Sequence, residues 1–136
     1  MAEKVEEKFL DVLQNIEFAL VGVFREHDKM TDYGADYAVE TLIKQYTAEL
    51  LGRTPPPPPN FPPHEQQAYD NVRAMCEWRL GRANAEDGSG QEVNPGEPIA
   101  LADIIACLKR IRTSIQFWTK KLGRRGYYEF VKGFVK

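Results

Sequence analysis

The chain has 136 residues, of which 43% are hydrophobic and 28% are charged. This length and composition fit one globular domain whose core needs no disulfide or metal, and they exclude an intrinsically disordered chain. The longest apolar run, residues 18–24, is far shorter than the roughly 20 residues of a membrane-spanning helix, so no membrane partner is expected. The N-terminus is charged and lacks the apolar core of a signal peptide, which favours a cytoplasmic protein.

The net charge of −2 conceals an asymmetry along the chain. Residues 1–100 carry nine basic and eighteen acidic side chains, a balance of −9, whereas residues 101–136 carry nine basic and two acidic side chains, a balance of +7. Such a separation of charge indicates a surface that attracts an anionic partner.

Two helices are predicted in the first 52 residues. The first spans about residues 3–26, and its apolar residues recur at alternating spacings of four and three: Val5, Phe9, Val12, Ile16, Ala19 and Val23. A turn over residues 28–32 follows, with Thr31 as the expected N-cap of the second helix. The inward residues of that helix are predicted to be Ala35, Val39, Leu42, Tyr46 and Leu50. It should end at Gly52, and so short a turn before it predicts an antiparallel hairpin.

Residues 54–63 contain seven prolines and cannot continue a helix. They are predicted to adopt a polyproline II conformation, in which ten residues span about 30 Å, the length of a 20-residue helix. Two roles fit such a segment. It can be a stiff connector that lets the next helix run parallel to the second one, or it can be a docking strip for an SH3- or WW-like domain of a partner.

A third helix is predicted over residues 63–80, with Ala68, Val72, Met75 and Cys76 on its apolar side and Gly81 at its end. Residues 82–98 are rich in Gly, Asn, Asp, Glu and Pro, which indicates a flexible surface loop. The two cysteines, Cys76 and Cys107, lie in apolar helical patterns and form no metal-binding motif. They are predicted to be buried, reduced thiols, with a disulfide or redox pair as the alternative.

The fourth helix, over residues 100–122, has the most regular pattern in the chain. Its apolar residues step by four and three: Ile104, Leu108, Ile111, Ile115, Trp118 and Leu122. Residues 123–126 should break it, and a short fifth helix should follow, with Tyr127, Phe130, Val131 and Phe134 on one side. No segment alternates convincingly with a period of two. The predicted fold is therefore all-α: one domain over residues 1–136, a compact bundle of four long helices plus a short C-terminal fifth helix.

The sequence contains no recognisable motif for catalysis, a cofactor or a metal. It has no phosphate-binding Gly-Lys-Ser/Thr loop, and His64-Glu65 lacks the second histidine that a zinc-protease helix requires. The other histidine, His27, is expected near the end of the first helix, where an imidazolium suits the helix dipole. We therefore assign no catalytic residue, cofactor or metal. An enzyme of unknown type stays a third hypothesis, because a carboxylate pair or a tyrosine can act in a pocket that no motif reveals.

The basic side of the fourth helix is the predicted interaction surface. On an ideal helix, Lys109, Thr113, Gln116 and Lys120 lie opposite the apolar stripe, and Phe117 falls among the cations. The candidate residues are Lys109, Arg112, Phe117, Lys120, Lys121, Arg124 and Arg125, together with Trp78, which lies outside the apolar stripe of the third helix. The structural alternative is a solvated cationic face whose charges balance the acidic first helix.

These residues favour a non-catalytic protein–protein interaction, with another protein or with a second copy of the chain as a homodimer. The second hypothesis is a nucleic-acid-associated helical protein, in which the same cations contact phosphates and Phe117 stacks on a base. A sequence pI of 5.7 argues against it, because nucleic-acid-binding domains usually have a pI above about 9.

Overall fold

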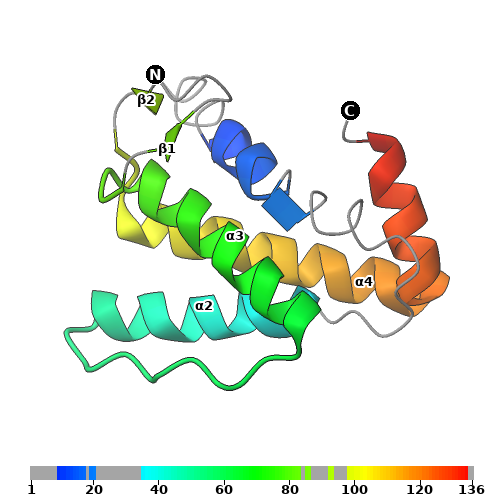
Figure 1. Ribbon diagram of the computed structural model, residues 1–136, viewed down its shortest axis with the longest axis horizontal. Helices are drawn as coiled ribbons and strands as arrows, with labels where there is room; N and C mark the ends of the chain where they lie inside the picture. The colour runs from blue at the N-terminus through cyan, green and yellow to red at the C-terminus, as the bar shows by residue number, and fades with distance from the viewer. Residues whose placement is uncertain are drawn as a thin grey trace.

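The computed structural model describes residues 9–17, 19–20, 35–83, 85–86, 92–93 and 98–134. For residues 35, 85–86, 92–93, 124–125, 128 and 130–134 it describes the backbone alone. Residues 9–17 and 19–20 are helical and form what we call the N-terminal helical segment. Three further helices follow: α2 (Ala35–Leu50), α3 (Pro63–Arg79) and α4 (Leu101–Phe134) (Figure 1). The described part of the chain is all-α, as its periodicity predicts.

The helix α2 ends where the sequence predicts. The Gly52 amide donates to the Glu49 carbonyl (3.0 Å), and the Arg53 amide donates to the Ala48 carbonyl (2.8 Å). These two bonds satisfy carbonyls that the end of a helix otherwise leaves without partners. The predicted turn over residues 28–32 and its N-cap Thr31 lie outside the described residues.

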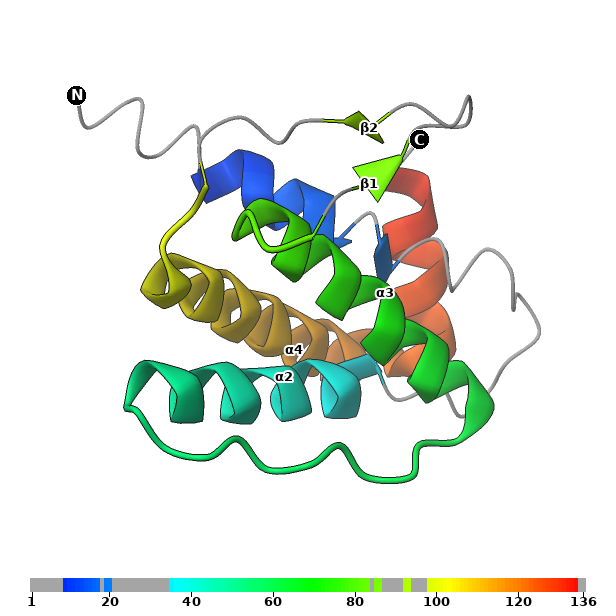
Figure 2. The same cartoon turned by 60° about the vertical axis from the view of Figure 1, so that its left-hand side comes forward.

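Residues 53–62, which we call the proline strap, run back along α2 in an extended path (Figures 1 and 2). As a result, α3 begins at the same end of the molecule as α2, and the two helices run in the same direction. The strap is held from its side by Gln45, whose Nε2 donates to the Pro56 carbonyl (3.2 Å). At its end, the ring centroid of Phe61 lies 5.2 Å from those of Tyr37 and Tyr69. The strap therefore joins two helices that run in the same direction.

A glycine turn closes α3, and the chain later returns to it. The amides of Gly81 and Arg82 donate to the Trp78 and Glu77 carbonyls (3.0 and 2.9 Å). Gly81 has a φ of 79°, in the left-handed region that favours glycine. A Cβ at this position would lie 3.0 Å from Pro98 Cγ, and the Ile99 amide donates to the Arg79 carbonyl (2.9 Å). Both ends of the predicted loop therefore meet at the carboxyl end of α3.

Within that loop, β1 (Ala85–Glu86) and β2 (Glu92–Val93) form an antiparallel ladder in which Ala85 lies opposite Val93. The sequence did not indicate this ladder, because two residues per strand are too few to show an alternation. It leaves the fold class unchanged. Residues 84, 87–91 and 94–97 of the predicted loop lie outside the described residues.

The core lies where α2, α3, α4 and the N-terminal helical segment face one another (Figure 2). Its fully buried side chains include Val12, Ile16, Val39, Leu42, Val72, Cys76, Ile104 and Leu108. α4 runs antiparallel to α2 and packs against it most extensively, and α3 also packs on α2 (Figure 1). Because α3 lies at an angle to this pair, the arrangement is a four-helix bundle only in a loose sense.

The helix α4 has a kink at Gly123, whose φ of 73° and ψ of 166° are not helical. Beyond it, α4 continues to Phe134 in a different direction, and Tyr127 is buried in the core (Figures 1 and 2). The fifth helix that we predicted as a separate element is therefore not found. The predicted break over residues 123–126 is reduced to one residue, because helical geometry resumes directly after Gly123. The side chains of Phe130, Val131 and Phe134 lie outside what the structure describes.

Two leucines at the ends of the predicted apolar stripes are exposed, contrary to the prediction. Leu50, in the last turn of α2, is 50% exposed, and Leu122, directly before the kink, is 44% exposed. Each stands at the end of a straight helical stretch, where the sequence pattern continues but the neighbouring helices no longer cover the side chain. None of the described helices combines the length and the apolar character that crossing a membrane requires.

Candidate interaction surface

One side of α4 is exposed and the other is buried, as its helical pattern predicts. Lys109, Thr113, Gln116 and Lys120 are exposed, whereas Ile104, Leu108, Ile111 and Ile115 are buried. We call the exposed side the outer face of α4. Burying a large aliphatic side chain stabilises a fold by about 1.5–3 kcal/mol, so the four buried residues hold α4 in this rotation and keep the cations outward.

Phe117 is the most exposed aromatic side chain on the outer face, at 51% exposure. Its ring contacts the Trp118 ring edge-on, with centroids 5.1 Å apart and planes at 87°. The Nζ atom of Lys121 lies 5.4 Å from the same ring centroid, a cation–π distance. Trp118 is partly buried against the core. We call Phe117, Trp118 and Lys121 the Phe117 patch, an exposed aromatic ring with a cation beside it.

The other predicted residues of α4 are placed as follows. Lys109 and Lys120 are exposed, and Arg112 is half-buried. The Lys109 carbonyl accepts a hydrogen bond from Thr113 Oγ1 (3.0 Å). Arg124 and Arg125 follow the kink, and their side chains lie outside what the structure describes. The structure therefore brings Lys120 and Lys121 close to Phe117 along one helix, with Lys109 about two turns earlier.

Trp78 does not join this surface. It lies near the end of α3 and is half-buried, and the Cζ atom of Arg79 lies 5.7 Å from its ring centroid. The Arg79 carbonyl is bonded to the Ile99 amide, directly before α4 begins at Leu101. Phe117 follows Leu101 by 16 residues, about 24 Å along a helix axis. The end of α3 that carries Trp78 therefore lies near the start of α4, whereas Phe117 lies near the end of the straight part of α4.

Within the described residues, Lys109, Lys120 and Lys121 form no ion pair with a carboxylate. The ion pairs of this part of the chain join Lys44 to Glu40, Arg79 to Asp11, and Arg82 to Glu49 and Glu77. Arg110, at the edge of the outer face, instead turns towards the N-terminal helical segment, with its Cζ atom 5.9 Å from the Phe9 ring centroid. Burial raises the pKa of Glu17 in that segment, and the Arg110 cation partly opposes the shift.

A second polar region, which the sequence did not reveal, joins α2 to α3. Tyr46 Oη donates to Glu77 Oε2 (2.9 Å), and Tyr69 Oη donates to Gln45 Oε1 (2.8 Å). An open cleft of about 420 Å³ lies between prolines 55–58 and the helices, and its lining includes Gln45, Tyr46, Glu77, Arg73 and Arg82. Burial and the neighbouring Cys76 and Glu77 raise the pKa of the Tyr46 phenol, so it stays protonated and donates.

This polar cleft is neutral in charge. Arg82 Nη1 lies 2.7 Å from Glu49 Oε1 and 3.7 Å from Glu77 Oε2, and Arg73 Nη1 donates to Tyr69 Oη (3.2 Å). The two cations are matched by two carboxylates, and one oxygen of each, Glu49 Oε1 and Glu77 Oε2, already has a partner. The arrangement links α2 to α3.

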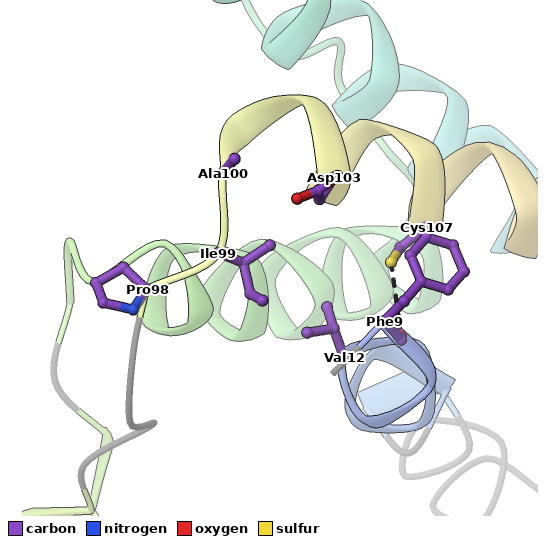
Figure 3. Close-up of a pocket in the computed structure, with 7 residues that line it drawn as sticks. All are labelled: Phe9, Val12, Pro98, Ile99, Ala100, Asp103 and Cys107. Atoms are coloured by element: carbon purple, nitrogen blue, oxygen red, sulfur yellow. Dashed lines mark hydrogen bonds between the residues drawn. The ribbon is translucent and has the colours of Figure 1, made fainter. Parts of the chain in front are cut away.

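An apolar pocket of about 310 Å³ lies between the N-terminal helical segment and the first turns of α4 (Figure 3). Phe9, Val12, Pro98, Ile99, Ala100, Asp103 and Cys107 line it. The Cys107 thiol donates weakly to the Phe9 carbonyl, with Sγ 3.9 Å from the oxygen. Burial, followed by the Asp103 charge, raises the pKa of Cys107 to about 11. A thiol of that pKa is a poor nucleophile at neutral pH.

The prediction of buried, reduced cysteines is confirmed. Cys76 and Cys107 are both buried and free. Burial raises the pKa of the Cys76 thiol above its ordinary value, and the charges of Glu77 and Cys107 add smaller parts of the shift. Two thiols held in the neutral form act as small apolar side chains.

In the part of the chain that the structure describes, no group of three or more His, Cys, Asp or Glu side chains could hold a metal ion. Comparisons with family models, with curated proteins and with solved structures give no match. Among the described residues, exposed lysines and an exposed aromatic ring lie together on the outer face of α4.

Proposed function

We propose that the chain is a non-catalytic protein–protein association module whose contact surface is the outer face of α4, centred on the Phe117 patch. The observation that carries this proposal is the half-exposed Phe117 ring, which contacts both Trp118 and Lys121. Aromatic side chains are enriched at interfaces, and a ring that is already fixed loses little conformational entropy when a partner covers it.

The occupant that charge favours is a second copy of the chain. Residues 1–100 have a charge balance of −9 and residues 101–136 have one of +7, so each copy carries both halves of a complementary pair. Complementary charges orient an encounter and raise its rate, while burial of the apolar side chains supplies affinity. In this arrangement, Lys120 and Lys121 meet acidic side chains of the other copy, and Phe117 inserts between apolar ones.

Sedimentation velocity over a range of protein concentrations tests the proposal. The wild-type chain should form a dimer whose affinity falls with added salt, because exposed charges are screened. Phe117→Ala should weaken the dimer about tenfold or more, as a central aromatic anchor does. Leu50→Ala is the matched control: it removes an equally exposed apolar side chain from α2 and should leave the dimer unchanged. A monomer at every concentration, or equal effects of the two variants, contradicts the proposal.

A nucleic-acid backbone is the second candidate, favoured by the lysines of α4 that have no carboxylate partner among the described residues. A fluorescently labelled single-stranded oligonucleotide distinguishes the two. Binding whose logarithm falls linearly with the logarithm of salt concentration would support contacts to phosphates. The charge-reversed pair Lys120→Glu and Lys121→Glu should then abolish that binding.

A further inference from the structure

We infer that the proline strap is a second interaction surface, which presents a preformed polyproline II ligand to an aromatic-lined groove of another protein domain. The strap is separate from the outer face of α4, and the inference does not depend on the association proposed above.

The backbone of the strap is preformed. Each proline fixes its own φ near −65°, and each residue before a proline is restricted to extended conformations, so prolines 55–59 have little choice but polyproline II. Pro62, at the end of the strap, has φ −56° and ψ 154°, which is polyproline II geometry. Aromatic-lined grooves recognise this helix because little conformational entropy is lost when it binds.

The strap is tied at both ends, which adds to this rigidity. The hydrogen-bonded end of α2 holds its start, through the Arg53 amide, and the Phe61 ring packs between Tyr37 and Tyr69 at the other end. A ligand fixed in its bound conformation binds more tightly than a flexible peptide of the same sequence.

The proline rings are not packed on the core. Prolines 55–58 are exposed, and the space between them and the helices is the open polar cleft lined by side chains such as Tyr46, Arg73 and Glu77. The ring surface of these prolines is therefore open to solvent on one side and to the cleft on the other. A segment that served only as a connector would need length and stiffness but no such exposed apolar surface. Contiguous apolar surface of this kind marks a binding site.

One edge of the strap is anchored and the others are free. Polyproline II has three residues per turn, so Pro56 and Pro59 share an edge, as do Pro55 and Pro58. Pro56 accepts the Gln45 hydrogen bond, and Pro59 is the one half-buried proline in the run. Of the two free edges, Pro57 shares its own with Thr54 and Asn60, so the edge formed by Pro55 and Pro58 is the one that offers two prolines to a partner. The exposed Arg53 beside it adds a cation, which suits a groove with an acidic rim.

The experiment is a titration of the full chain into an isotopically labelled SH3 domain and, separately, a labelled WW domain, followed by NMR. Groove resonances of at least one of the two domains should shift. The double variant Pro55→Ala/Pro58→Ala should weaken binding about tenfold, the loss expected for an anchoring contact. Pro56→Ala/Pro59→Ala is the matched control, because it removes the same number of prolines from the anchored edge and should weaken binding far less.

Three results would overturn the inference. One is the absence of shifts in both domains. Another is binding of a synthetic peptide of residues 53–63 without binding of the full chain, which would mean that the fold hides the strap. The third is an equal loss in the two double variants, which would mean that no edge is read. Circular dichroism of both variants checks that the helices are retained.

Discussion

The side of the molecule formed by α2 and α3 and the outer face of α4 differ in how their polar side chains are satisfied. Between α2 and α3, polar side chains are partnered within the chain, as in the Tyr46–Glu77 hydrogen bond and the Arg82–Glu49 ion pair. On the outer face, within the described residues, Lys109, Lys120 and Lys121 have no carboxylate partner, and an aromatic ring stands among them. The first region therefore links two helices within the fold, whereas the second leaves lysines and an aromatic ring exposed at the surface.

The largest expected effect tests whether the two sides of α4 differ as this comparison requires. Leu108→Ala should lower the free energy of unfolding by about 2–5 kcal/mol, because Leu108 is fully buried and the cavity persists. Leu122 belongs to the same predicted apolar stripe but is 44% exposed. Leu122→Ala should therefore lower the free energy of unfolding by less than about 1 kcal/mol. Urea unfolding followed by circular dichroism measures both. Similar losses would mean that Leu122 is covered by the fold as Leu108 is, which would contradict its exposure.

The next test concerns the charged group that is buried most deeply on α3. Arg79 Nη1 lies 3.1 Å from Asp11 Oδ2, and the side chains are 6% and 58% exposed. Asp11→Asn should destabilise the protein by about 1–3 kcal/mol, because it takes the charge partner away from a buried guanidinium. Arg79→Met should cost less, since it replaces the buried charge with an apolar chain and leaves Asp11 in water. The same urea experiment ranks them, and the reverse order would contradict this account.

A smaller effect is expected from the hydrogen bonds between α2 and α3. Tyr46→Phe should cost about 1 kcal/mol, the usual value of one such bond, since it removes the donor to Glu77. Tyr37→Phe, on the same helix, is the control, because Tyr37 is largely exposed and its change should be close to zero. Thermal unfolding at neutral pH resolves the difference. If the two variants behaved alike, the hydrogen bond between Tyr46 and Glu77 would contribute nothing to stability.

The residues that the sequence predicted and those it missed differ in how far apart their partners lie in the chain. The spacing of Ile104, Leu108, Ile111 and Ile115 is a local property, and it correctly placed Lys109, Phe117 and Lys120 on the exposed side of α4. The extended path of the proline strap along α2 likewise agrees with a local property, its run of prolines. The partners of Tyr46 and Arg79, by contrast, are 31 and 68 positions away, and no periodicity encodes such pairs. The exposed Leu50 and Leu122 show the same limit, because burial at a helix end depends on where the neighbouring helices stop.

The smallest expected effect concerns Glu17 of the N-terminal helical segment, whose carboxylate is attracted by Arg110 at the edge of the outer face of α4. Burial raises the pKa of Glu17 above 4.5, more than the Arg110 cation lowers it. Above pH 4.5 and up to the raised pKa, the folded state therefore holds more protons than the unfolded state, so stability falls as pH rises through this window. Glu17→Gln should remove that decline and stabilise the protein at neutral pH by a fraction of a kcal/mol, because partial exposure screens the carboxylate. Below pH 4.5 the stabilities of the variant and the wild type should converge.

Urea unfolding across the acid range measures these stabilities. A loss of stability in Glu17→Gln at neutral pH would contradict the prediction, because it would mean that the attraction between Glu17 and Arg110 outweighs the cost of burying the carboxylate.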